Sequence, residues 1–338
     1  MGVVIRWLSR GVVVGVLTAV FLCLGIVGCS YVLMRQTDLA AYDRPAGAID
    51  VTDRLAALAG PDGQIDPVAA AAAFDAVAPR LAGTQIIVVP SYLYDQFRWL
   101  RARGVGDYFM DQQRWLAARG LTVTLADGDT EATVAENGRR LAGLVAGGDR
   151  PVCFVSHSKG GLEVLDALLR LTPDQRARVR CWIAMQAPFG GSPFADMVVD
   201  TPLLHPLIDG MSWVLGGSGD AVVDLGTPVR RAWMAQNDAA IAGLVAEIPV
   251  LAVTTRLLPR DDWRAWSPFA GGRYWMDAHG IPSDGVVPTR SAILPHARFV
   301  RIEGLDHGDV MDGDRPWSPI LSDDTALIAA LFAIVMGE

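Results

Sequence analysis

Residues 151–161 constrain the fold of this chain more than any other segment. Residues 152–155 are Val-Cys-Phe-Val, an apolar run of β-branched and aromatic side chains, and residues 156–161 read Ser-His-Ser-Lys-Gly-Gly. Leucines then recur at helical spacing between 162 and 169. The pattern predicts a buried strand that turns sharply into a helix around Ser158.

The small residues around Ser158 fit a strained turn of this kind. Gly160 stands two residues after it and Ser156 two residues before it. Such a turn lifts a serine hydroxyl to the edge of a sheet. It also leaves the N–H of Lys159 at a helix N-terminus, where it faces any oxyanion that forms there. Ser158 is therefore the candidate nucleophile, and the Lys159 amide is a candidate oxyanion-hole donor.

Length and charge narrow the function classes. The chain has 338 residues, of which 51% are hydrophobic and 20% charged, which suits a globular protein with a sizeable core. The formal net charge is −8, and Lys159 is the only lysine. Without a basic, aromatic-laced patch, the chain offers nothing typical of a nucleic-acid partner.

The N-terminus has the pattern of an export signal. Residues 1–28 carry Arg6 and Arg10 but no acid, and residues 11–28 are nearly all apolar or small. The segment ends in Ile-Val-Gly-Cys29, which resembles the bacterial lipobox and makes Cys29 the expected lipidation site. The alternative is an uncleaved transmembrane anchor. Either interpretation predicts an exported, membrane-tethered protein of the bacterial cell envelope, in the periplasm or at the outer membrane.

Two further cysteines lie in the body of the protein. Cys153 and Cys181 each fall within an expected core strand. We expect them to be small buried hydrophobic residues. A disulfide between neighbouring strands is the alternative that an oxidising compartment allows.

The chain divides into three parts. After residues 1–28, residues 29–82 are rich in Ala, Asp and Pro and predict a tether with one or two helices. Residues 83–338 alternate between strands and helices, which predicts a parallel sheet covered on both faces. Strands are expected at 85–90, 121–126, 152–156, 181–186, 249–254 and 298–303, and helices at 108–119, 130–146, 160–171 and 325–336.

One long stretch breaks this alternation. Residues 192–247 contain helical segments but no clear strand, and they predict a helical cap insertion. A second irregular stretch covers residues 257–281. Together these stretches hold half of the ten tryptophans, whose apolar surface suits an acyl chain or simply packs the cap onto the core: Trp213, Trp233, Trp263, Trp266 and Trp275.

A serine hydroxyl needs a base that removes its proton, and that base is usually a histidine held by a carboxylate. His307 follows the last expected strand in a Gly-flanked loop, at the edge where the base belongs. The other four histidines are placed less well: His157 inside the turn, His205 in the cap, His279 ahead of the acid and His296 at the start of a strand.

The preferred acid is Asp284, in the Ser-Asp-Gly-Val-Val-Pro turn at 283–288 ahead of the last strand. Asp261 and Asp262 are the competitors, because they lie nearer the end of the preceding strand. Asp306 is adjacent to the base and badly placed to orient it. The alternative interpretation of Asp284 is an Asp-Gly turn former.

With these motifs in order, the chain resembles the bacterial lipase branch of the α/β-hydrolases. Residues 156–161 resemble the Gly-His-Ser-x-Gly-Gly turn of that family, 187–196 resemble its Pro-His-x-Gly-Ser segment, and 283–288 resemble its acid turn. The resemblance spans about residues 84–310. It implies an α/β-hydrolase fold: a mostly parallel central sheet flanked by helices, with a helical cap insertion.

The resemblance also implies a serine hydrolase that acts on carboxylic esters, either small molecules or lipids, through Ser158, His307 and Asp284. No cofactor and no metal are expected. Residues 89–92 read Val-Pro-Ser-Tyr where the family has His-Gly, so position makes the N–H of Tyr92 the second oxyanion-hole donor. Phe189 stands where the family often has His, a change we expect to alter packing more than chemistry.

Other classes remain as alternatives. The altered loop at 89–92 favours a binding module that keeps the hydrolase fold, and an acyltransferase would share the acyl-enzyme step. Ser156 and Lys159 also match the Ser-x-x-Lys motif of penicillin-binding proteins, but the later Lys-Thr-Gly is absent. No His-Glu-x-x-His motif indicates a metal hydrolase. The acids Asp309, Asp312 and Asp314 predict a solvated loop rather than a calcium site.

Overall fold

The core of the protein is one parallel sheet. The computed structural model describes residues 45–61, 63–92, 94, 108–200, 221–258, 267, 269–311 and 324–337. In this part of the chain seven strands form a sheet in the order β1-β7-β6-β5-β4-β2-β3, with every neighbouring pair parallel. The strands are β1 (Ile49–Asp50), β2 (Gln85–Val89), β3 (Thr122–Leu125), β4 (Val152–His157), β5 (Val179–Met185), β6 (Val250–Arg256) and β7 (Arg298–Glu303).

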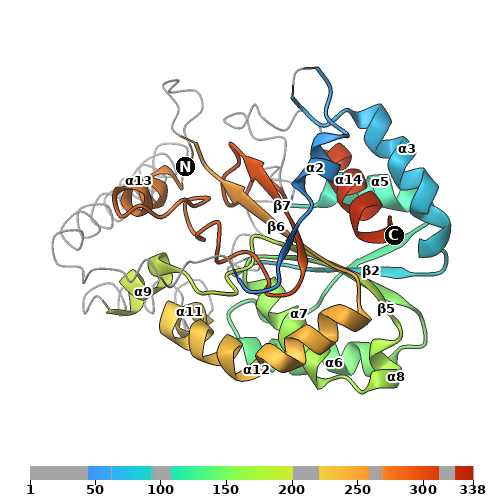
Figure 1. Cartoon of the computed structure of the whole chain (residues 1–338). Coiled ribbons are helices and arrows are strands. Elements are labelled where there is room, and N and C mark those ends of the chain that lie inside the picture. The colour runs from blue at the N-terminus through green and yellow to red at the C-terminus, as the bar shows by residue number, and fades with distance from the viewer. Residues whose placement is uncertain are drawn as a thin grey trace, which may run out of the picture.

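Helices cover both faces of this sheet (Figure 1). One face carries α2 (Thr52–Ala56), α3 (Pro67–Val77), α5 (Met110–Ala118) and α14 (Asp324–Met336), and the other carries α6 (Val134–Gly147), α7 (Lys159–Arg170) and α12 (Thr227–Glu247). The shorter elements are η2 (Ala78–Leu81), α8 (Pro173–Arg176), α9 (Pro193–Asp200), α11 (Ala221–Asp224) and α13 (Ala270–Ala278).

Strand β2 shows why its sequence is apolar at every position. Ile86 and Val88 belong to the core beneath α14, while Ile87 and Val89 belong to the core beneath α7. Successive side chains of a strand point to opposite faces, so a strand covered by helices on both sides needs apolar residues throughout. This confirms the predicted mostly parallel, two-faced sheet.

The predicted cap insertion at 192–247 contains two kinds of helix. Helices α9 and α11 contact each other at one side of the molecule (Figure 1). Helix α12 instead covers the sheet, because Ile241 and Leu244 are buried in the same core as Leu165 of α7. We therefore place α12, the second half of the stretch 192–247, among the helices that cover the sheet. The boundaries predicted at residues 28, 82 and 192 stay a prediction.

The two body cysteines are joined. Cys153 of β4 and Cys181 of β5 are direct register partners, with their Cα atoms 4.7 Å apart, and they form a disulfide. Both residues are fully buried, as expected, but they are paired, which is the alternative that an oxidising compartment allows. The sequence places both residues in strands but does not show that those strands are neighbours.

Several predictions concern residues outside the described part of the chain. These are the leader at 1–28, the lipidation site Cys29, and Trp213, Trp263 and Trp266. The other two tryptophans of the irregular stretches pack against neighbours: Trp233 against the core beneath α7, and Trp275 in a small cluster with Met276. Among the helices that the structure describes, none combines the length and the apolar character that crossing a bilayer requires.

Candidate active site

Ser158 lies at the sharp turn between β4 and α7, with φ 54° and ψ −125°. Non-glycine residues rarely adopt this backbone conformation, and such strain concentrates at functional sites. The two glycines that follow allow close packing. A Cβ on Gly160 would lie 2.5 Å from the carbonyl oxygen of Val89, and one on Gly161 would lie 2.3 Å from the Cβ of Ala187. Both positions therefore require glycine.

Ser156 departs from the family pattern for a local reason. Its hydroxyl accepts a hydrogen bond of 2.8 Å from the indole N–H of Trp182, and both residues are fully buried. A buried N–H without an acceptor costs free energy. The serine thus satisfies a tryptophan that glycine would leave unpaired.

The structure brings the three predicted side chains together. His307 Nε2 lies 2.9 Å from Ser158 Oγ, and His307 Nδ1 lies 2.8 Å from Asp284 Oδ2. A carboxylate oxygen only accepts, so Nδ1 carries the proton and Nε2 has a free lone pair. That lone pair faces the serine hydroxyl, which is the arrangement a general base needs.

The position of Asp284 is fixed by its own turn. Its second oxygen, Oδ1, accepts hydrogen bonds from the amides of Val286 (2.9 Å) and Val287 (2.7 Å). Its carbonyl accepts the N–H of His307 at 3.1 Å. Asp284 is 1% exposed, whereas Ser158 and His307 are 6% and 7% exposed, so the acid is the deepest of the three.

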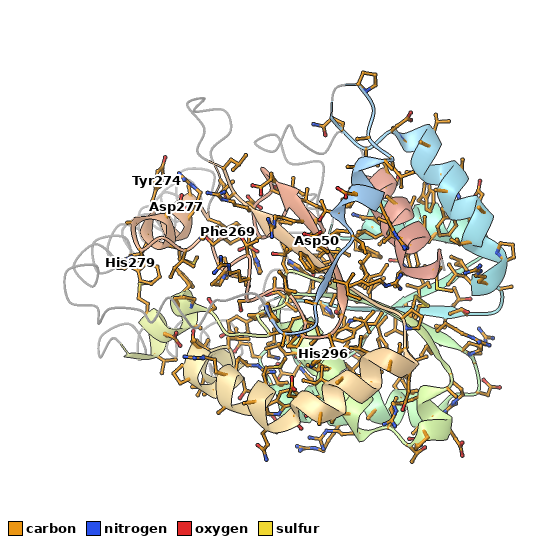
Figure 2. The ribbon with its side chains drawn as sticks, in the orientation of Figure 1. Asp50, Phe269, Tyr274, Asp277, His279 and His296 are labelled. Carbon is orange, nitrogen blue, oxygen red and sulfur yellow. A yellow bond between two sulfur atoms is a disulfide. The ribbon has the colours of Figure 1, made fainter. Side chains whose placement is uncertain are left out.

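The competing residues are engaged elsewhere or not described. His279 Nδ1 bonds the carbonyl of Trp275, and His296 Nε2 lies 3.0 Å from Asp238 of α12, which fits its expected structural role (Figure 2). Asp306 accepts the amides of its own turn. Outside the described residues lie His205, Asp261, Asp262, Asp312 and Asp314.

Neither a family model nor a curated protein matches the sequence. Solved structures do match. The metagenomic carboxyl esterase MGS0156 has a TM-score of 0.58 at 22% identity, covering 76% of this chain and 75% of that one. The mature lipase BlEst2 of Bacillus licheniformis has a TM-score of 0.53 at 22% identity, covering 68% and 87%. The lipase of Staphylococcus hyicus has a TM-score of 0.52 at 12% identity, covering 75% and 94%.

The chain has the α/β-hydrolase fold. In this fold the expected place for a nucleophile is the turn from a central strand into a helix. Ser158 occupies that place here, after β4, which lies between β5 and β2 in the sheet. Asp284 and His307 flank β7 in the sequence, which is the chain order expected of the fold.

The long side chain of Lys159, the first residue of α7, does not reach solvent. It is buried and forms an ion pair with Glu163 one helical turn further along α7. Its Nζ also donates to the carbonyl of Thr130 at 3.2 Å. Burial raises the pKa of the Glu163 carboxyl, and the Lys159 cation acts in the opposite direction. The side chain therefore links α7 to the loop after β3.

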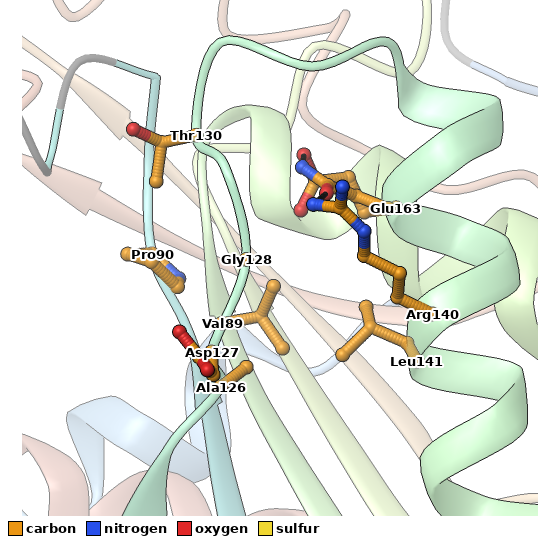
Figure 3. Close-up of a pocket in the computed structure, with 10 residues that line it drawn as sticks. Val89, Pro90, Ala126, Asp127, Gly128, Thr130, Arg140, Leu141 and Glu163 are labelled. Carbon is orange, nitrogen blue, oxygen red and sulfur yellow. Dashed lines mark hydrogen bonds between the residues drawn. The ribbon is translucent and has the colours of Figure 1, made fainter.

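A small cleft lies beside this ion pair in the α/β-hydrolase core (Figure 3). Backbone from the loops after β2 and β3 forms one side, and side chains of α6 and α7 form the other. Its polar lining comes from Asp127, Thr130, Asn137, Arg140 and Glu163. Asn137 donates to Glu163 at 2.8 Å, so the carboxylate is held by an amide as well as by the ammonium.

The loop after β2 departs most from the pattern of the family that the sequence resembles. The N–H of Ser91 donates to the hydroxyl of Tyr108 at 2.8 Å, and the half-buried Tyr92 packs against the cluster formed by α9 and α11. Sequence reasoning missed Tyr108 and Gln186, which bond residues around the turn. Gln186 is the first residue after β5, and this position at the end of a strand is the one sequence feature that could have marked it as a site residue. The packing of Phe189 edge-on against Trp182 agrees with the expected packing role.

Proposed function

We propose that this protein is a serine hydrolase that cleaves carboxylic esters through Ser158, His307 and Asp284. The observation that supports the proposal best is the unbroken pair of hydrogen bonds from Ser158 Oγ to His307 Nε2 and from His307 Nδ1 to Asp284, at a strained turn. Three residue types from three separate loops meet with the geometry that nucleophilic catalysis needs.

The proposed reaction steps follow from the tautomer of His307, which has its proton on Nδ1. The Ser158 oxygen attacks the ester carbonyl carbon while its proton moves to His307 Nε2. Asp284 accepts a hydrogen bond from the Nδ1–H throughout and stabilises the imidazolium. His307 then gives its new proton to the departing alcohol, which leaves an acyl group on Ser158. A water molecule, deprotonated by His307, releases the acid and restores the serine.

The oxyanion is stabilised by backbone donors. Lys159 is the first residue of α7, so its N–H has no acceptor within the helix. We assign the second donor to the N–H of Tyr92, because the preceding amide of Ser91 already donates to Tyr108. Removing one good donor typically costs about 10²–10³ in rate.

We further propose lipid-like esters as the preferred class. The similar solved structures include a carboxyl esterase and two lipases, which supports an ester and favours an apolar acyl group. Binding and acyl transfer remain the other two classes that the same fold can serve. Catalysis is favoured over binding alone because the Ser158–His307–Asp284 arrangement is complete.

We also propose that the protein is exported and tethered to the membrane through Cys29 or through an N-terminal anchor. The Cys153–Cys181 disulfide supports export, because disulfides persist in oxidising compartments and are rare in the cytosol. A lipid on Cys29 would be seen as a mass increase of the N-terminal peptide. A full-length N-terminus without lipid would support the anchor.

The function is tested by hydrolysis of p-nitrophenyl esters of increasing acyl length. We expect Ser158→Ala to lower kcat by a factor on the order of 10⁶, as in related triads. Ser291→Ala is the matched control, since it removes a buried hydroxyl that bonds only the carbonyl of Gly191 among the contacts described, and it should keep its activity. Wild-type hydrolysis by Ser158→Ala would refute the proposed nucleophile.

A further inference from the structure

A chain of hydrogen bonds connects the oxyanion loop to the loop that carries the base. At one end the N–H of Ser91 donates to the Tyr108 hydroxyl at 2.8 Å. The Tyr108 oxygen lies 3.2 Å from His157 Nδ1. At the other end His157 Nε2 lies 2.8 Å from the carbonyl oxygen of His307. Two side chains thus join the backbones of the two loops that flank Ser158.

Two of the bonds in this chain have a direction set by their ends. A carbonyl only accepts, so His157 Nε2 carries a proton and donates to His307. In the neutral ring His157 Nδ1 is then the acceptor, and the Tyr108 O–H donates to it. The same phenolic oxygen accepts from Ser91. A neutral His157 ring with its proton on Nε2 therefore satisfies all three bonds together.

Gln186 fixes the same end of the chain. Its amide N–H donates to the carbonyl of Asp306 at 2.8 Å and to the Thr255 hydroxyl, while its oxygen lies 3.0 Å from His157 Nε2. Gln186 is fully buried and His157 is 3% exposed. The backbone at 306–307 is therefore held by two buried side chains as well as by its own turn.

Backbone strain gathers at these residues. In the described part of the chain, five non-glycine residues have positive φ, and the four that lie in or beside this network are Tyr108 (33°), Phe109 (68°), Ser158 (54°) and Gln186 (53°). Such a strained residue persists only where the surroundings hold it, most often at functional sites. Phe109 is buried, and its N–H donates to Met311 at 2.7 Å, just beyond the base loop.

We propose that Tyr108 and His157 are positioning residues that set the distance between the oxyanion-hole loop and His307. Gly160 holds one side of that loop through close contact with the carbonyls of Val89 and Pro90. The Tyr108 hydroxyl holds it at Ser91, immediately before the proposed donor Tyr92. The inference rests on the proposed function, because it assigns these residues a role in the same ester cleavage.

The first test is Tyr108→Phe, which removes one hydroxyl and keeps the ring that packs 4.7 Å from Tyr94. Misplacing a catalytic group by about 1 Å can cost 10²-fold in rate, so we expect kcat to fall about 10- to 100-fold. KM should stay within about twofold, because the hydroxyl does not touch substrate. Tyr274→Phe is the matched control, since that tyrosine is 60% exposed on α13 (Figure 2), and it should match the wild type.

The second test uses two replacements of His157. In His157→Gln the side-chain amide nitrogen can reach the Nε2 position and keep the bond to His307, but the acceptor for Tyr108 is lost. We expect kcat to fall about 10-fold. Adding this change to Tyr108→Phe should cost little more, because both break the same link, whereas independent structural effects would multiply. If Tyr108→Phe fails to fold, the kcat of His157→Gln alone decides whether the positioning role is correct.

Wild-type kcat in Tyr108→Phe or in a folded His157→Gln would overturn the inference. So would a change in KM without a fall in kcat, or a double variant whose fall in kcat is the product of the two single falls. The Ser158→Ala variant separates this failure from failure of the proposed function. If Ser158→Ala is inactive while Tyr108→Phe is normal, only the positioning role is wrong. If Ser158→Ala is active, the proposed function is wrong.

Discussion

The buried ion pair beside the nucleophile allows a sharp prediction about stability. The side chains of Lys159 and Glu163 are 1% and 6% exposed, and Nζ of the only lysine in the chain bonds both Glu163 and the carbonyl of Thr130. Lys159→Met keeps the stem but removes the charge. Breaking a buried pair by removing one partner typically costs about 3–5 kcal/mol. At about 2 °C per kcal/mol for a domain of this size, the expected drop in Tm is about 6–10 °C.

The loss of stability caused by Lys159→Met should depend on pH in a defined direction. Burial already raises the pKa of Glu163 above its ordinary value of 4.5, and the two largest opposing contributions come from Lys159. Without the lysine the pKa rises further. A carboxyl that binds its proton more tightly in the folded state makes the free energy of unfolding fall as pH rises from the unfolded pKa to the folded pKa. The Lys159→Met deficit should therefore be larger at pH 8 than at pH 5.

The measurement is the free energy of unfolding in urea for the wild type and for Lys159→Met, at pH 5 and at pH 8. Arg170→Met is the control, because Arg170 pairs with Asp166 at the same spacing on the same helix but is 38% exposed. An exposed pair of that kind contributes about 0–1 kcal/mol. Adding Glu163→Gln to Lys159→Met should recover most of the stability at pH 8. A Lys159→Met protein as stable as the wild type at pH 8, or equally destabilised at both pH values, would show that the reasoning is wrong.

Three further predictions follow from single contacts. Ser156→Ala should lower the free energy of unfolding by about 1–3 kcal/mol, measured in urea, because the indole N–H of Trp182 loses its acceptor; an unchanged value would contradict that bond. Gly160→Ala should lower both Tm and kcat, because its Cβ would lie 2.5 Å from a backbone oxygen; a normal enzyme would disprove the close approach. Asp284→Asn should lower kcat on the order of 10⁴-fold without unfolding the protein, because His307 loses its tautomer partner; a kcat near wild type would reassign the acid.

Local patterns predicted the sheet and the turn well. Strand β7 has the predicted bounds, and β4 extends one residue beyond its predicted end, into the turn. Strand β4 is buried at every position, ends at a sharp turn and is followed at once by a helix, so its own residues determine its bounds. β1 escaped prediction because two residues are too few to show a period. Helix α12 was assigned to a cap because its sequence does not reveal that Ile241 and Leu244 face the sheet.

The site was predictable where chemistry restricts the residue type. A serine at a strand-to-helix turn, a histidine after the last strand and an aspartate between them follow from the roles they would fill. The environment of Lys159 did not follow, because burial depends on which loops surround the helix. The Tyr108–His157 link joins residues 49 positions apart, and only the folded chain brings them to within 3.2 Å.

The most direct test of the account is covalent labelling of the folded protein with a fluorophosphonate, followed by mass spectrometry of the modified peptide. We expect the label on Ser158, loss of labelling in Ser158→Ala, and slower labelling in Asp284→Asn. A folded protein that hydrolyses esters but carries the label on another residue would contradict the assignment. A folded protein that is neither labelled nor active would contradict the proposal that this fold serves as an enzyme.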